Sequence, residues 1–108
     1  MLVKEILSIF EDRMAGYLTD EEKKGYLAEF EAIETEKDDL ELSENSDLSI
    51  KAPFSELYLL YLKLKAEAKA NEFAQYQNTQ LQFLTLYSDY KRGVMRRSPV
   101  GRQTIKYF

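Results

Sequence analysis

The chain has 108 residues, of which 44% are hydrophobic and 31% are charged, and its formal net charge is −4. This length predicts one compact domain with a modest core. Cysteine and histidine are absent, which excludes disulfides, thiolate nucleophiles and zinc ribbons and removes the commonest acid–base catalyst. The composition therefore favours a protein that is not an enzyme and holds neither metal nor cofactor. No apolar run approaches the ~20 residues of a membrane span, so we expect no membrane partner.

Two helices are predicted in the N-terminal third of the chain. The first helix is predicted over residues 2–17, because their apolar side chains have helical spacing, and Gly16 is its predicted stop. A second helix is predicted over residues 20–37, because Thr19 and Glu22 have the spacing of a capping box. The predicted buried stripes are Leu2, Ile6, Ile9 and Phe10 in the first helix and Tyr26, Leu27, Phe30 and Ile33 in the second.

The segment over residues 38–53 breaks the helical pattern and is rich in acids. Its short alternation of apolar residues is compatible with a small hairpin as an alternative, but we expect a flexible acidic loop. The sequence "DDLELSENSDLS" lacks the glycine and the ligand spacing of a calcium-binding loop, so we predict no metal site. The acidic side chains singled out here are Asp38, Asp39, Glu41, Glu44 and Asp47.

Two further helices are predicted after Pro53, with Ser55 as the N-cap. Nothing over residues 54–92 forces a break, yet one helix of that length would span about 55 Å, too much for a small domain. We therefore predict a turn near residues 76–79, and a fourth helix that ends at Arg92 before Gly93. The predicted buried positions are Leu57, Leu60, Tyr61, Leu64 and Ala68 in the third helix and Leu81 or Leu84, Tyr87 and Tyr90 in the fourth.

The predicted fold is thus an all-α, small bundle of about four helices. It has an acidic loop between the second and third helices and an extended basic C-terminal arm. We divide the chain into a helical domain, residues 1–93, and the arm, residues 94–108. Residues 1–90 sum to −10 and residues 91–108 to +6, a charge asymmetry typical of an interaction tail.

The arm and the surplus tyrosines are the candidate interaction sites. Fifteen extended residues could reach about 50 Å, far enough to cross onto a neighbouring subunit; phosphate binding and a plain disordered tail are the alternatives. The tyrosines could form the core or a protein interface, and we assign Tyr61 and Tyr87 to the core. The predicted interface residues are Tyr58, Tyr76, Arg92, Arg96, Arg97, Arg102, Lys106, Tyr107 and Phe108.

The stretch "APFSELYLLYLKLKAEAKANEFAQYQNTQLQFLTLYSDYKR" resembles a segment of the small head–tail connector (adaptor, or neck) proteins of tailed bacteriophages and prophages. "LTDEEKKGYLAEFEAIE" is similar to the preceding helix of that family, so the resemblance covers about residues 18–92. Two departures are Gln77, where asparagine is usual, and the sequence after the last helix. The matching residues are Ala52, Pro53, Phe54, Tyr58, Tyr61, Leu62, Asn71, Glu72, Tyr76, Asn78, Phe83, Tyr87 and Tyr90.

The resemblance implies a structural role in virion assembly and DNA packaging. Proteins of this family form a homo-oligomeric ring between the portal protein and the next neck or tail-completion protein, with DNA as passing cargo and no small-molecule substrate. The implied location is the virion neck, and the host cytoplasm during assembly. An acidic channel wall would repel DNA, which makes the loop acids channel-facing candidates. The alternative is a small acidic phage-encoded protein that mimics nucleic acid and inhibits a host protein.

Overall fold

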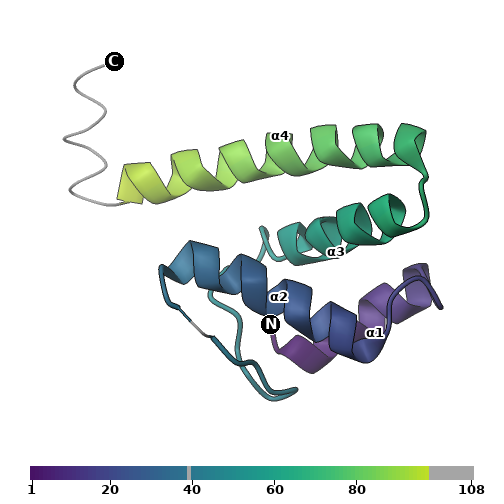
Figure 1. The fold of residues 1–108 in the computed structure, drawn as a ribbon. Helices are drawn as coiled ribbons and strands as arrows, with labels where there is room; N and C mark the ends of the chain where they lie inside the picture. Colours follow the sequence, from purple (N-terminus) through teal and green to yellow (C-terminus); the bar gives the residue numbers. More distant parts are fainter. Residues whose placement is uncertain (39, 98–108) are drawn as a thin grey trace.

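The structure, a computed structural model, describes residues 1–38 and 40–97, with side chains described as far as Gly93. It contains four helices, α1 (Val3–Arg13), α2 (Asp20–Thr35), α3 (Glu56–Lys69) and α4 (Phe73–Arg97) (Figure 1). The protein is therefore the small all-α bundle that the sequence predicts. None of the helices within the described residues is both long and apolar enough to cross a membrane.

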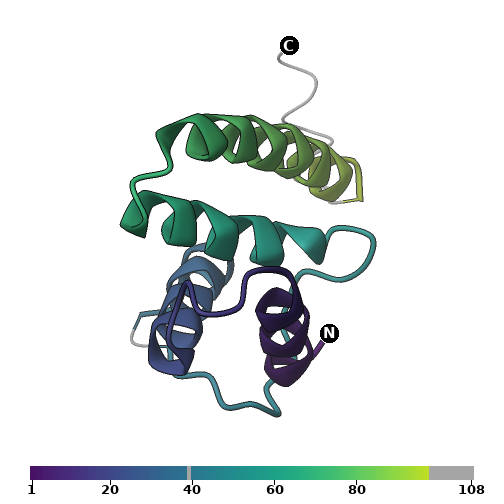
Figure 2. The same cartoon turned by 90° about the vertical axis from the view of Figure 1, so that its right-hand side faces the viewer.

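The helices form three layers, and α3 is the middle one (Figure 2). α1 and α2 cover one side of α3, and α4 runs antiparallel to α3 along the other side (Figures 1 and 2). Because α3 is enclosed from two sides, it is buried over much of its circumference rather than along one stripe. Its buried residues are Leu57, Tyr58, Leu59, Leu62, Leu64, Ala66 and Glu67.

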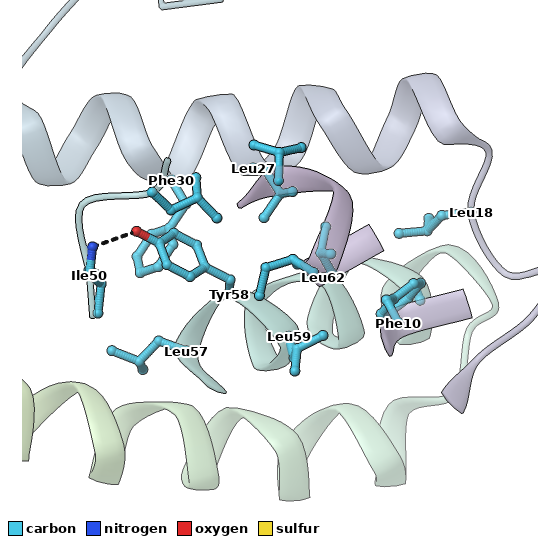
Figure 3. Packing of buried hydrophobic residues seen from close by; sticks show 13 residues of the cluster. Phe10, Leu18, Leu27, Phe30, Ile50, Leu57, Tyr58, Leu59 and Leu62 are labelled. Atoms are coloured by element: carbon cyan, nitrogen blue, oxygen red, sulfur yellow. Dashed lines mark hydrogen bonds between the residues drawn. The ribbon is translucent and has the colours of Figure 1, made fainter. Parts of the chain in front are cut away.

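The hydrophobic core lies where α1, α2 and α3 meet (Figure 3). Leu48 and Ile50 also belong to it and are fully buried, although they lie between α2 and α3 in the sequence. The segment around them is bound to the N-terminal end of α1, since the backbone N–H of Val3 donates to the carbonyl of Ser46 at 3.0 Å. Leu48 and Ile50 thus attach this stretch to the core, a contact that the expectation of a flexible acidic loop did not include.

The capping box that starts α2 is present as predicted. The N–H of Glu22 donates to the Thr19 hydroxyl at 3.1 Å, and the N–H of Thr19 donates to the Glu22 carboxylate at 2.9 Å. α1 ends earlier than predicted, at Arg13. The turn that follows it contains Gly16 at a φ of +82°, a left-handed conformation that glycine adopts without steric cost.

The turn between α3 and α4 lies at residues 70–72, not at the predicted residues 76–79. Asn71 occupies the left-handed region there, with a φ of 57°, which asparagine tolerates better than most residues. Thr79, which falls in the predicted turn, is instead a buried residue within α4. Nor does Gly93 end α4, which continues to Arg97.

Several predicted stripe positions face water. Ile33 of α2 is 61% exposed, and Leu81 and Leu84 of α4 are 68% and 54% exposed. Ala68 of α3 is exposed as well. For the two leucines of α4, the reason is that this helix contacts the bundle along one side. The side chains that fill that side are mainly aromatic: Phe83, Tyr87 and Tyr90, with Leu86 beside them.

Candidate protein-interaction surface

The outward side of α4 carries three of the five large apolar side chains that are exposed in the described part of the chain. We define the outer face of α4 as Phe73, Gln77, Leu81, Leu84 and Ser88, all exposed. Phe73 is 65% exposed, and the two leucines are among the few large apolar side chains left in water. Figures 1 and 2 show why: α4 is the outermost layer, with its far side uncovered by any other helix.

This face is also free of charge. Residues 73–88 contain no Asp, Glu, Lys or Arg, although 31% of the whole chain is charged. An exposed helix normally carries charged residues on its solvent side, whereas the centres of protein interfaces are depleted of charge. The combination of exposed leucines and absent charge is therefore typical of a surface that contacts another protein.

The opposite side of α4 is fixed by stacked aromatic rings. The Phe83 and Tyr87 rings stack at a centroid distance of 5.5 Å, and Phe30 of α2 meets Phe83 edge-on at 5.7 Å. Phe30 also stacks on Tyr61 of α3 at 4.8 Å. Tyr61 and Tyr87 are thus half-buried and packed against the core, in agreement with their predicted role.

A buried carboxylate joins α4 to the end of α2. The side chain of Glu34 is 3% exposed and accepts hydrogen bonds from the Tyr87 hydroxyl at 2.5 Å and from the Lys91 amine at 3.1 Å. Burial by itself would lower the pKa of Lys91, but Glu34 outweighs burial and the pKa is raised. The aromatic stack and this ion pair hold α4 in one orientation, which keeps its outer face pointed at solvent.

The basic end of the helix lies beyond this contact. Arg92 is exposed and forms an ion pair with Asp89. Arg96 and Arg97 are in the last turn of α4. The side chains of these two arginines, and the predicted arm residues Arg102, Lys106, Tyr107 and Phe108, lie outside the described part of the chain.

Tyr58 is not an interface residue, contrary to the prediction. It is fully buried, and its ring meets Phe30 edge-on at 5.6 Å (Figure 3). Its hydroxyl accepts from the N–H of Ile50 at 2.9 Å and donates to Glu31 at 2.7 Å. Glu31 also accepts from the N–H and the hydroxyl of Ser49. Tyr58 thus binds the segment after α2 to the bundle, while Tyr76, the other predicted interface tyrosine, is half-buried on α4.

We expect the stability of the protein to fall steeply above pH 10. Burial raises the pKa of Tyr58 well above the ordinary value near 10, and Glu31 raises it further. Above pH 10 the unfolded chain loses this proton while the folded chain keeps it, so the free energy of unfolding falls by about 1.4 kcal/mol per pH unit. Urea titrations between pH 9 and 11 should show a shallower fall for Tyr58→Phe; equal slopes would contradict the buried hydroxyl.

The acidic candidates of the loop have different environments. Asp38 and Glu41 are exposed, and Asp39 lies outside the described residues. Glu44 pairs with Lys24 at 3.4 Å. Asp47 pairs with Lys51 at 2.6 Å, and this hydrogen bond, followed by the one from the amine of Met1, lowers its pKa. The loop therefore presents scattered carboxylates, two of which are neutralised by neighbouring cations.

Two places where a chemical site could form are a cluster of metal-binding side chains and a surface groove. The described part of the chain contains no group of three or more acidic, histidine or cysteine side chains that could hold a metal ion. A groove of about 220 Å³ lies between α1, α3 and α4, with an apolar floor that includes Phe10, Met14 and Leu59. The Arg13–Glu56 ion pair lies at its edge, at 2.5 Å. This groove has no nucleophile and base within reach of each other.

Comparison with models of known protein families, with curated proteins and with solved structures finds no match to this chain. The sequence does contain a signal for the outer face, because residues 73–88 carry no charge. Apolar periodicity alone did not find this face, since it predicted Leu81 or Leu84 to be buried.

Proposed function

We propose that this protein is a structural head–tail connector of a tailed bacteriophage or prophage. In this role it assembles as a ring between the portal protein and the next neck or tail component and completes the DNA channel. The observation that carries the proposal is the outer face of α4, an exposed helical surface with leucines and no charge. Such a surface suits a subunit that works by packing against other proteins.

The residues that carry the family resemblance support the same function. Phe83, Tyr87 and Tyr90 fill the contact between α4 and the rest of the bundle. Tyr58 and Leu62 are fully buried in α3. The resemblance therefore falls on residues that build the α3–α4 hairpin, whose outward side is the proposed assembly surface.

The acids of the loop are the proposed channel lining. Asp38 and Glu41 are exposed and form no ion pair in the described part of the chain. Repulsion between such carboxylates and DNA phosphates would keep the passing DNA from adhering. Charge reversal at these two positions should slow DNA exit or block packaging, and unchanged packaging and infectivity would contradict a channel position.

A nucleic-acid mimic is the less favoured alternative. Such a protein needs an extended row of unpaired carboxylates to compete with DNA phosphates. Here many acids are paired with lysine or arginine at separate places, as in Glu11–Lys23 at 2.7 Å and Glu22–Lys69 at 2.8 Å. Within the described residues, paired acids of this kind interrupt the row of carboxylates that a mimic needs.

Deletion of the gene from its phage or prophage tests the connector function. We expect DNA-filled heads and free tails that fail to join, with rescue by the wild-type chain supplied in trans. Cryo-electron microscopy of intact particles should place the chain as a ring below the portal. Complete necks in the deletion strain would refute the connector function.

A further inference from the structure

We propose that two copies of this chain pair through the outer face of α4, with the two helices antiparallel about a two-fold axis. The pairing rests on the surface chemistry of α4 and not on the connector function. A two-fold contact uses the same patch on both subunits and closes after two copies. It therefore occupies the same face that supports the connector proposal, so the two copies of a pair would have to separate before this face could join a ring.

The spacing of the outer face is that of a helix–helix seam. Phe73, Gln77, Leu81, Leu84 and Ser88 follow one another at intervals of four, four, three and four residues. Steps of three and four residues keep the five positions on one side of the helix, and three of them, Phe73, Leu81 and Leu84, are the apolar side chains of the proposed contact line. The sixteen residues span about 24 Å at 1.5 Å per residue. The opposite side of the same helix packs against the bundle, and none of the other described residues, 1–38 and 40–97, buries Phe73, Leu81 or Leu84.

An antiparallel register makes the seam complementary to itself. With Leu81 opposite Leu84 of the second copy, both leucines of each subunit are covered. The same register sets Gln77 opposite Ser88 of the second copy, where amide and hydroxyl can form a hydrogen bond. It also brings Phe73 to Arg92 of the second copy, where a guanidinium can lie over the ring. Since residues 73–88 carry no charge, the centre of the contact buries no ion.

The charges at the two ends of α4 select the antiparallel orientation. One end carries Lys91, Arg92, Arg96 and Arg97 within the helix, of which Lys91 is paired with Glu34 and Arg92 with Asp89. The other end begins beside Glu72, and the first turn of α2 lies at the same end of the molecule, where Glu22 is paired with Lys69 and Asp20 with Lys23, while Glu21 adds a further carboxylate. Antiparallel pairing brings the basic end of each copy toward the acidic end of the other, whereas parallel pairing would bring the two basic ends together.

The oligomeric state of the full chain in solution is the first test. One helix pair lies at the small end of specific interfaces, so we expect a monomer–dimer equilibrium with a dissociation constant on the order of 100 µM. Sedimentation equilibrium up to millimolar protein should detect it. Leu81→Lys should weaken the dimer at least ~30-fold, because it places an unpaired charge at the centre of the contact.

Matched variants separate this effect from loss of folding. Ile33→Lys makes the same kind of change at an exposed position of α2, 61% exposed, and should leave the dimer intact. A mixture of Leu81→Lys and Leu84→Glu should regain dimer as the mixed species, since the register sets the new lysine opposite the new glutamate. Circular dichroism should show unchanged helix content in all three variants.

Cysteine cross-linking tests the direction of the two helices, and the chain has no native cysteine to interfere. A mixture of Gln77→Cys and Ser88→Cys should form a mixed disulfide under mild oxidation. Ser88→Cys alone should not cross-link, because antiparallel helices keep the two copies of position 88 about 16 Å apart.

Three results would overturn the pairing: a monomer at every concentration, a dimer that Leu81→Lys leaves unchanged, or efficient self-cross-linking of Ser88→Cys. These outcomes are independent of the connector test. A protein that is monomeric in solution yet forms a neck ring would refute the pairing alone. A dimer whose deletion leaves necks complete would refute the connector function alone.

Discussion

Replacing Tyr58 with alanine should lower the free energy of unfolding by about 3–5 kcal/mol, the usual cost of removing a buried aromatic side chain. Tyr58 is fully buried between α2, α3 and the segment that precedes α3. Its loss would also leave the N–H of Ile50 and one interaction of Glu31 unsatisfied. Since a domain of this size has a total stability of about 5–15 kcal/mol, chemical denaturation should detect the effect easily.

Two further variants divide this effect into its parts. Tyr58→Phe keeps the ring and removes the hydroxyl, so it should cost about 1–3 kcal/mol through the unsatisfied polar groups. Tyr76→Ala, on the half-buried tyrosine of α4, should cost less than about 1.5 kcal/mol. If Tyr58→Ala were as mild as Tyr76→Ala, Tyr58 would be the surface residue that the sequence first indicated.

Replacing Leu48 with alanine should destabilise the protein by about 2–5 kcal/mol, although Leu48 lies in the acid-rich segment between α2 and α3. The side chain is fully buried in the core. The N–H of Leu48 donates to the carbonyl of Met1 at 3.0 Å, so the surrounding backbone is held in place and cannot close over the cavity. Urea unfolding monitored by circular dichroism measures this cost.

Leu81→Ala is the matched control, because it makes the same chemical change at a leucine that is 68% exposed. We expect a change in stability within about 0.5 kcal/mol for the monomer. Equal costs for the two leucine variants would mean that the segment around Leu48 is the flexible loop that its composition suggests. A large cost at Leu48 alone would mean that this segment is part of the fold.

The sequence alone determined the helical nature of the protein and the start of α2. The 3.6-residue periodicity of apolar side chains is a local property, so it predicted four helices in about the right places. The Thr19 cap depends on two residues three positions apart, and it was found as predicted. The absence of cysteine and histidine likewise excludes disulfides, thiolate chemistry and histidine-based acid–base catalysis from the sequence alone.

The tertiary structure decided which of the apolar residues are buried. Tyr58 and Leu81 both occupy apolar positions of predicted helices, yet one is fully buried and the other is largely exposed. Periodicity locates an apolar stripe to within a turn, but it does not say how many sides of a helix have neighbours. Among the described residues, α3 has neighbours on two sides and α4 on one, so an apolar position is buried in the first helix and can remain an uncovered leucine in the second. Leu48 and Ile50 show the same limit, because only the three-dimensional path of the chain brings an acid-rich segment back into the core.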